Sequence, residues 1–432
     1  MNFDESLSYL LGLGHETLAI KLGLENTERL LEALGHPQNS FPSVQIAGTN
    51  GKGSTAVMLE SISHAVHIKT GLYTSPHLVR INERIRIDGS EISAEAFARL
   101  ATRARDAAER LLSESKLQTL PTFFEHLTAI ALLAFKEAQV DLAILETGLG
   151  GRLDATTCAG AQVVAITPIS LDHQEYLGQT IEEIASEKAA IIREGVTAIV
   201  APQAAEALRV IMKRCAECHV TPRVDECRTK VVGADETGRL QVTFETKQER
   251  YENVRLGLRG RHQVTNAATA VSLAEALCER GFSIQKEAII AGLEESRHAG
   301  RLELRAGRPS ILFDGAHNAA GAQALRDYLD EFMEAPLTII FGAMRDKDLQ
   351  EIAGKFFPAA SRLILTVPQN PRAATLETLT KVVPEGFTSS RITLAPSAHE
   401  ALLAAQAQTP PEGIICVTGS LYLVGEVKSL ID

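Results

Sequence analysis

A glycine-rich stretch near the start of the chain most constrains how the chain can fold. It follows the apolar run 44–47, which is typical of a buried strand, and precedes residues 56–66, whose apolar positions recur at helical spacing. A strand, a glycine turn and a helix N-terminus form a cradle for phosphate, because the glycines let several backbone N–H groups point inward. Lys52 would reach the terminal phosphates, and Ser54 would offer a hydroxyl to Mg²⁺ or phosphate. The stretch comprises Gly48, Thr49, Asn50, Gly51, Lys52, Gly53 and Ser54.

The spelling of this stretch differs from the common G-x-x-x-x-G-K-[ST] pattern. Two residues separate Gly48 from Gly51, and a glycine stands between Lys52 and Ser54. An ordinary tight turn is the alternative that a short glycine loop leaves open. The strand–loop–helix context favours a nucleotide site over that alternative.

Composition limits the partners of the chain. The 432 residues suggest two or three domains, and 45% hydrophobic with 22% charged residues is typical of a globular protein. The net charge of −11 argues against a nucleic-acid partner, which would need a basic face. The first residues lack a basic region followed by an apolar core, and no run of about 18 apolar residues occurs. We therefore expect a cytoplasmic, monomeric protein without a membrane anchor.

The cysteines lie at positions 158, 215, 218, 227, 278 and 416. A zinc site built from Cys215, Cys218, His219 and Cys227 is conceivable from their spacing. The alternative is that residues 204–218 form an amphipathic helix with partly buried free thiols, as a reducing compartment allows. We favour this second interpretation.

Strands and helices alternate along most of the chain. Apolar runs at 44–47, 140–146, 163–167 and 197–201 are separated by helical segments, which predicts a P-loop-type, doubly wound, mostly parallel sheet. Residues 222–260 alternate like a small antiparallel β section. From Arg301 a new pattern begins, with strands at 310–313, 337–341, 362–366 and 414–418, and predicts a second, smaller Rossmann-like α/β domain. We place the boundary between domains 1–297 and 298–432.

Polar residues follow several of these strands. Ser75, Glu146 and His173 would meet at the carboxyl edge of the first sheet, where a hydroxyl, a carboxylate and an imidazole can hold Mg²⁺. Asp314, with His317 and Asn318 close behind, opens the corresponding loop of the second sheet and suggests ribose, phosphate or substrate contacts; a plain Asx turn is the alternative. Lys188 lies on a helical segment, where a solvated ion pair is the default.

A series of motifs occurs in order along nearly the whole chain: 48–54, 75–78, 146–155, 171–173, 187–189, 262–267, 300–303 and 314–318. This set closely resembles the Mur-ligase superfamily, and within it folylpolyglutamate synthase and dihydrofolate synthase. The run 146–155, with 122–125 and 419–425, resembles the folate branch. Cell-wall ligases place a nucleotide-sugar domain before the phosphate loop, where this chain has 47 residues.

The resemblance assigns roles to individual residues. It implies ATP contacts at 49–54, Asn266, Arg301 and Asp314, and catalytic roles for Lys52, Lys188, His173 and His317. It implies a metal site, which we expect to hold two Mg²⁺ ions, with Ser54, Ser75, Glu146 and His173 as ligands, and a carbamate on Lys188. The implied substrate contacts are Lys21, Leu22, Gly23, Leu24, Thr122, Phe123, Phe124, Glu125, Arg152, Leu153, Asp154, Ala155 and Ser420, with Phe123 or Phe124 stacking on the pterin. Thr157 and Ala190 depart from the family pattern, which expects Asn and Gly.

The resemblance implies an ATP-dependent ligase that joins L-glutamate to a folate or dihydropteroate carboxylate through an acyl phosphate. We favour a bifunctional dihydrofolate synthase and folylpolyglutamate synthase over a monofunctional folylpolyglutamate synthase. Less favoured are a different Mur-type amino-acid ligase, a P-loop ATPase that drives motion, and a binding protein without catalysis. Acceptor-independent ADP release would distinguish the ATPase from a ligase.

Overall fold

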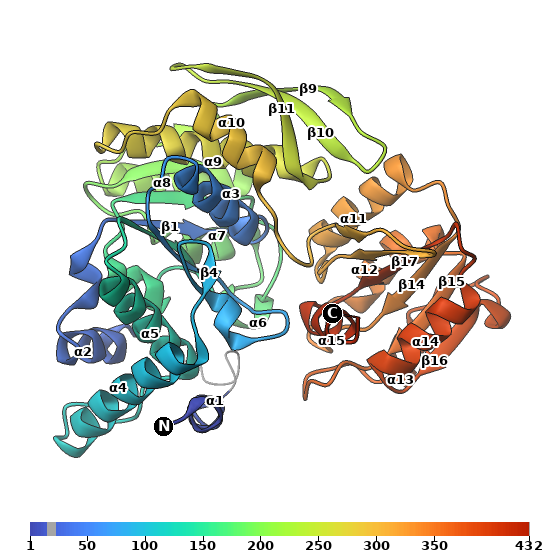
Figure 1. Ribbon diagram of the computed structural model, residues 1–432, viewed down its shortest axis with the longest axis horizontal. Helices are drawn as coiled ribbons and strands as arrows, with labels where there is room; N and C mark the ends of the chain where they lie inside the picture. Colours follow the sequence, from blue (N-terminus) through green and yellow to red (C-terminus); the bar gives the residue numbers. More distant parts are fainter. Residues whose placement is uncertain (15–22, 432) are drawn as a thin grey trace.

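The computed structural model describes residues 1–14 and 23–431 and contains two large sheets side by side (Figure 1). The first has the order β4-β3-β2-β5-β1-β6-β7-β8, in which all neighbouring strands pair parallel except for the antiparallel β3 and β4 at one edge. Its strands are β1 (Ser43–Ala47), β2 (Thr70–Tyr73), β3 (Ile85–Ile87), β4 (Ser90–Glu91), β5 (Leu142–Glu146), β6 (Val163–Ile166), β7 (Thr197–Val200) and β8 (Arg223–Val224).

Helices cover both faces of this sheet, so its central strands are buried on both sides. One core packs α3 (Lys52–His64), α9 (His262–Glu279) and α10 (Lys286–Glu295) against the sheet. On the other face, α4 (Ala94–Ser113) and α5 (Phe123–Ala138) form a second core with α1 (Phe3–Gly12) and α2 (Glu25–Ala33). A third core includes α7 (Ile181–Ala189) and α8 (Ala205–Glu217), next to the short α6 (Gln174–Leu177).

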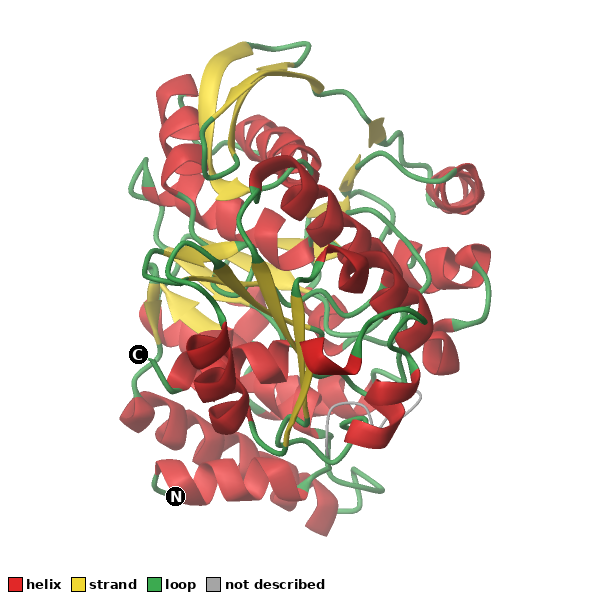
Figure 2. Ribbon diagram, turned by 90° about the vertical axis from the view of Figure 1, so that its right-hand side faces the viewer, coloured by secondary structure: helices red, strands yellow, loops and turns green. Residues whose placement is uncertain are grey.

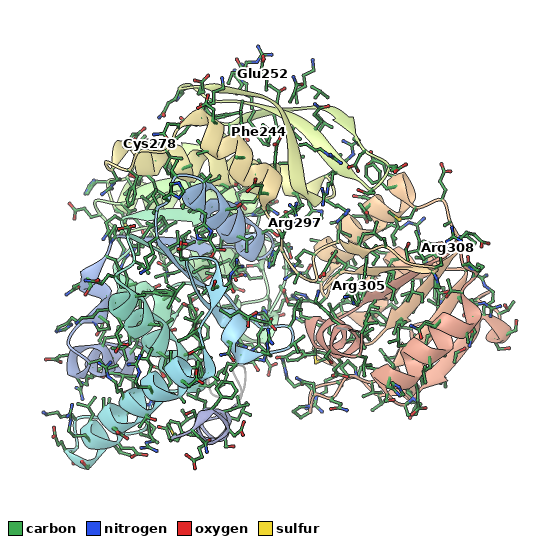
Figure 3. The ribbon with its side chains drawn as sticks, viewed as in Figure 1. Phe244, Glu252, Cys278, Arg297, Arg305 and Arg308 are labelled. Carbon is green, nitrogen blue, oxygen red and sulfur yellow. The ribbon has the colours of Figure 1, made fainter. Side chains whose placement is uncertain are left out.

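A small antiparallel sheet lies over α10, at the top of Figure 1. It consists of β9 (Arg228–Ala234), β10 (Arg239–Glu245) and β11 (Arg250–Arg259). Phe244 is fully buried against the helices, whereas Glu252 lies at the outer rim (Figure 3). We call all elements up to α10 the N-terminal part of the molecule.

The C-terminal part is built on the second sheet, which faces the viewer in Figure 2. Its order is β12-β13-β17-β14-β15-β16, and only β12 pairs antiparallel. Its strands are β12 (Glu303–Arg305), β13 (Ser310–Phe313), β14 (Leu337–Phe341), β15 (Arg362–Thr366), β16 (Ile392–Ala395) and β17 (Ile414–Thr418). The helices α11 (Ala319–Phe332), α12 (Leu349–Phe356) and α13 (Leu376–Lys381) cover one face, and α14 (Ala398–Gln408) and α15 (Leu421–Ser429) cover the other. The 3₁₀ turns are Pro37–Ser40, Ile81–Arg84, Ala155–Ala159, Phe357–Ala359 and Ser389–Arg391.

The predicted fold class is confirmed: a doubly wound, mostly parallel sheet with a small antiparallel section and a second α/β sheet. Four edge strands, β4, β8, β12 and β16, were not anticipated, since each is short and at least partly exposed. The strand β8 lies in the segment 222–260, which was expected to be antiparallel, but it pairs parallel with β7. Among the helices of residues 1–14 and 23–431, none is long and apolar enough to cross a bilayer.

The cysteines fit the helix interpretation. All six are free, and α8 buries Cys215 and Cys218 against the third core. Cys218 donates to the carbonyl of Ile192 at 3.3 Å. Cys227 belongs to the first core instead, so the structure does not bring it together with the other two.

Candidate active site

A cavity of about 530 Å³ opens between the N-terminal and C-terminal parts. The phosphate loop 48–54 forms its floor, together with residues that follow β2, β5 and β6. The C-terminal part contributes residues 314–318, Lys347 and 420–422. The carboxyl ends of parallel strands from both sheets therefore meet at one cavity, as expected for ligand sites in open α/β folds.

The phosphate loop is held by close backbone contacts. Gly48 has φ +149°, and a Cβ there would lie 1.9 Å from Thr167 Oγ1; Gly51 has φ +90°, and its Cβ would lie 2.1 Å from Asn266 Oδ1. Only glycine fits at either position. Lys52 folds over the loop and donates from Nζ to the carbonyls of Gly48, at 3.2 Å, and Thr49, at 3.3 Å.

Glu146, at the end of β5, presents a buried carboxylate to this loop. Its Oε2 accepts a hydrogen bond from the Ser75 backbone N–H at 3.1 Å. Burial raises the pKa of Glu146, while the charge of Lys52 opposes that shift. The Lys52 ammonium favours the ionised form of Glu146, and a bound metal ion would favour it further. Glu146 can therefore serve as an oxygen ligand of a metal ion.

The donor set fits Mg²⁺, which binds through few protein oxygens and completes its shell with phosphate and water. The Glu146 carboxylate and the Ser54 hydroxyl both line the cavity beside the loop, as does Ser75. His173 lines the cavity too, and burial lowers its pKa to about 3, so its imidazole is neutral. In residues 1–14 and 23–431 no three His, Cys, Asp or Glu side chains cluster as a self-sufficient metal cage.

Lys188 is buried rather than solvated, which overturns the expectation of a surface ion pair. Its Nζ donates to the Gly48 carbonyl at 2.9 Å, so it contacts the phosphate loop directly. Burial lowers the pKa of Lys188 to about 7, and the charge of Lys52 adds to the effect. A substantial fraction of the side chain is therefore a neutral, nucleophilic amine at neutral pH.

Asp172 joins the two parts of the molecule. Its carboxylate forms an ion pair with Lys347 Nζ at 2.5 Å and accepts from Asn318 Nδ2 at 3.0 Å. Asn318 also donates to Asn50 Oδ1 at 3.0 Å, on the phosphate loop. Burial works to raise the pKa of Asp172, but the hydrogen bond and charge of His317 and the charge of Lys347 hold it well below the usual range. His317 Nε2 lies 3.7 Å from the same carboxylate.

One wall of the cavity holds most of the expected substrate contacts. Gly23, Thr122, Phe124, Glu125, Arg152, Leu153, Asp154 and Ala155 line it. Phe124 lies 5.8 Å from Tyr73 between ring centroids. Phe123 instead packs in the core beneath the cavity, so Phe124 is the residue placed to stack on a flat ring. Leu24 is not among the residues that line the cavity, and Lys21 and Leu22 lie outside the described residues.

Asp154 lines this wall and also fixes its backbone. Its carboxylate accepts from the backbone N–H groups of Gly148, at 2.8 Å, Leu149, at 3.0 Å, and Thr156, at 3.0 Å. Arg152, which also lines the cavity, forms an ion pair with Glu187 at 2.9 Å. The loop 147–155 is thus fixed by one buried carboxylate.

Residues of the C-terminal part are positioned in the same way. Asp314 accepts from the backbone of Leu302 at 3.0 Å and Ala316 at 2.9 Å, and so fixes the loop that carries His317. Burial raises the pKa of Asp314, and the charge of Arg301, which also lines the cavity, counteracts that rise. Ser420 is the N-cap of α15.

Known proteins resemble this chain along its length. The Mur ligase middle domain matches residues 46–274, and the Mur ligase glutamate ligase domain matches residues 300–421. The dihydrofolate synthase/folylpolyglutamate synthase of Bacillus subtilis is 34% identical over 96% of this chain and 96% of its own. The chain belongs to the folylpolyglutamate synthase and dihydrofolate synthase family of Mur ligases. It is therefore an ATP-dependent ligase of the Mur type.

Further members of the folylpolyglutamate synthase and dihydrofolate synthase family agree in sequence and structure. A Mycobacterium tuberculosis folylpolyglutamate synthase complexed with ADP has a TM-score of 0.91 at 31% identity, over 99% of each chain. Escherichia coli FolC in complex with DHPP and ADP has a TM-score of 0.88 at 32% identity, over 100% of this chain and 98% of that one. The probable bifunctional folylpolyglutamate synthase/dihydropteroate synthase of Haloferax volcanii is 35% identical over 99% of this chain, which spans about half, 50%, of that protein.

Sequence reasoning about this family member missed several cavity residues. His298, Gln263, Lys347, Tyr176 and Arg372 all line the cavity. Gln263 lies within the motif 262–267, so its place in that motif could have suggested that it lines the site. His298 and Lys347 carry no local signal, because they reach the site only through the packing of the C-terminal part against the phosphate loop.

Proposed function

We propose that the chain joins L-glutamate to the carboxylate of dihydropteroate and of reduced folates, with ATP as the energy source. The observation that carries the proposal is the meeting of the phosphate loop, the Glu146 carboxylate and Lys188 in the same cavity as the aromatic wall at Phe124. The E. coli FolC structure with DHPP and ADP supports it, since that relative holds a nucleotide and a DHPP molecule together.

The first chemical step forms an acyl phosphate. The acceptor's carboxylate oxygen attacks the γ-phosphorus of ATP, and ADP leaves. Backbone N–H groups of 49–54 and the Lys52 ammonium would hold the phosphates while negative charge spreads over the transferring group. When bound through Ser54, Ser75, Glu146 and His173, Mg²⁺ would neutralise part of that charge. We propose two such ions.

The second step forms the amide. The neutral amine of glutamate attacks the acyl carbon, phosphate leaves with the bonding electron pair, and the nitrogen loses its proton. His317 and Ser420, from the C-terminal part, lie on the cavity wall where they could meet glutamate and the γ-phosphate. A cavity closed by both parts would keep water away from the acyl phosphate.

Nucleotide and pterin contacts complete the proposal. Asn266, Arg301 and Asp314 would bind ATP beside the loop, and Gly23, Thr122, Phe124, Glu125 and 152–155 would bind the pterin end. We further propose that residues 1–297 and 298–432 are the two domains. The cytoplasmic location and the monomeric state stay predictions.

Lys188 is proposed to carry a carbamate. Its neutral amine can add to CO₂, with loss of one proton, and the product is an anion in place of a cation. That anion would orient a Mg²⁺ ion beside the phosphate loop. The contact between Lys188 Nζ and the Gly48 carbonyl places the end of this side chain next to the loop. The lowered pKa of Lys188 supports this modification, since a protonated amine cannot attack CO₂.

The decisive experiment measures ADP release from purified protein with ATP, Mg²⁺ and L-glutamate, adding dihydropteroate or tetrahydrofolate separately. Turnover that needs glutamate with both acceptors, and products heavier by one glutamyl residue, would establish the bifunctional ligase. Turnover with one acceptor would assign one activity. ADP release without any acceptor would contradict the proposal and favour an ATPase.

Lys52→Ala tests the phosphate site within the same assay. We expect kcat to fall by a factor on the order of 10³, because the charge that compensates the transferring phosphoryl group is lost. Lys381→Ala is the matched control, since that lysine is exposed on α13. Near-normal ligation by Lys52→Ala would refute the assigned role.

A further inference from the structure

The glycine between Lys52 and Ser54 lies directly under the imidazole ring of His298. A Cβ at Gly53 would lie 2.9 Å from His298 Cε1 and 3.3 Å from Glu146 Oε2. Gly53 is in the first turn of α3 and needs no unusual backbone angle, so its lack of a side chain is explained by this neighbour. The unusual spelling of the phosphate loop thus makes room for a residue that lies 245 positions later.

His298 lies on the segment that connects the two parts of the molecule, between α10 and β12. Its neighbour Arg297 lies between the two parts in Figure 3 and donates to the carbonyls of Glu294 and Ser296. The imidazole reaches from this segment into the cavity, where Nδ1 lies 3.1 Å from Ser54 Oγ. A contact between the connecting segment and the phosphate loop is therefore built into the fold.

The hydrogen bonds around Ser54 leave its hydroxyl hydrogen available for this contact. Asn266 Nδ2 donates to Gln263 Oε1 at 2.9 Å, which leaves the Gln263 amide nitrogen as the donor to Ser54 Oγ at 3.4 Å. Ser54 Oγ has two lone pairs: one accepts from Gln263, and when the other faces a cation, the hydroxyl hydrogen is left for His298 Nδ1, 3.1 Å away. The chain of donors then runs from Asn266 through Gln263 and Ser54 to His298.

We propose that His298 is a positioning residue, which accepts the hydrogen of the Ser54 hydroxyl and so turns an oxygen lone pair of Ser54 toward the phosphate-bound cation. This inference rests on the proposed function of the site, in which Ser54 is a ligand of Mg²⁺. If the Ser54 hydroxyl hydrogen pointed toward the cation, it would repel the cation, and the hydroxyl could not serve as a ligand. His298 acts through Ser54 and does not contact the phosphates itself.

Two amide substitutions separate this role from simple space filling. In His298→Asn the side-chain oxygen can occupy the place of Nδ1 and still accept from Ser54. In His298→Gln the amide reaches the place of Nε2 and leaves Ser54 without its acceptor. Both variants keep a polar amide under which Gly53 fits, so a general loss of packing would affect them alike.

The readout is the affinity for a fluorescent ATP analogue, titrated at equilibrium with Mg²⁺ and with EDTA. We expect His298→Gln to weaken Mg²⁺-dependent binding by about tenfold, the usual effect of one lost hydrogen bond to a charged site, with little change in EDTA. His298→Asn should stay within about threefold of the parent, since it restores the acceptor. Equal losses with Mg²⁺ and EDTA, or equal losses in the two variants, would overturn the proposal.

A double-mutant cycle with Gly53→Ala tests the contact itself. In the parent protein the added methyl group meets the imidazole, so Mg²⁺-dependent binding should weaken strongly. In the His298→Ala background the ring is gone, and Gly53→Ala should cost several-fold less. Equal costs in both backgrounds would show that the ring is not what requires glycine. Binding is measured without an acceptor, so a protein that fails to ligate glutamate refutes the proposed function and leaves this test intact.

Discussion

Burial acts against charge at several single residues of the site. It lowers the pKa of Lys188 and raises the pKa of Glu146 and of Asp314. Such groups are costly in an empty cavity and become favourable when a ligand of opposite charge enters. The charges of these individual side chains would be balanced by the nucleotide phosphates and by a bound cation.

Carbamate formation on Lys188 should therefore depend on pH. The folded-state pKa, about 7, lies below the ordinary lysine value, so the reactive amine is present above pH 7 and is lost as the pH falls through 7. We expect a carbamate signal in ¹³C NMR with ¹³C-bicarbonate, stronger at pH 8 than at pH 6. Lys188→Met should lack the signal. An equally strong signal in that variant would assign the carbamate to another amine.

Single elements of the site depend on carboxylates that bind backbone amides. Asp154 fixes the loop after β5 through three backbone N–H groups, and Asp314 fixes the loop after β13 through two. Both loops carry residues that line the cavity. The loops are therefore shaped before any substrate arrives.

Asp154→Asn should loosen the first of these loops. The amide can accept fewer hydrogen bonds and places an N–H group against backbone donors, so we expect a loss of about 2 kcal/mol in the free energy of unfolding. The KM for the folate acceptor should rise more than the KM for ATP. Urea denaturation and steady-state kinetics measure both effects. Asp106→Asn, at an exposed ion pair, is the control and should change stability by less than about 0.5 kcal/mol. A rise in the KM for ATP alone would contradict the role given to the loop.

The same scale shows what a sequence can and cannot reveal. The strand–loop–helix around residue 50 follows from local patterns and was predicted. The helix α4 also follows from its periodicity and from Ser93 as its N-cap. The alternating pattern of residues 81–88 predicts an exposed strand, but the segment begins as a 3₁₀ turn, and Ile81 and Ile85 are buried in the core. The burial of Lys188 and the approach of His298 depend on contacts across more than a hundred residues, which no local pattern records.

At the scale of the whole molecule, the two parts are joined across the cavity by a nearly buried ion pair. The side chains of Asp172 and Lys347 are 6% and 9% exposed. Asn318 adds contacts to Asp172 and to Asn50 on the phosphate loop. The arrangement of the parts is thus set at the site where phosphate would bind.

Asp172→Asn should open the unliganded molecule. Lys347 would be left without its partner, and an uncompensated buried charge costs roughly 3–5 kcal/mol. Small-angle X-ray scattering should show a larger radius of gyration. In the Asp172→Asn, Lys347→Met double variant no charge is left unpaired, so the increase should be smaller than in the single variant. An unchanged radius in the single variant would show that other contacts hold the parts together. Lys381→Ala, at an exposed ion pair on α13, is the control.

The close contacts of the phosphate loop limit the transfer of this loop into another protein. Gly48, Gly51 and Gly53 are each met by a different partner: Thr167 beyond β6, Asn266 on α9 and His298 on the connecting segment. If residues 48–54 were grafted into the strand–loop–helix of another protein, the loop sequence would be present but these three partner residues would be missing. The loop is therefore not a portable module: an exchange at Gly53 would need a smaller side chain at position 298, whereas the positive φ of Gly48 and Gly51 would strain any other residue whatever its partner.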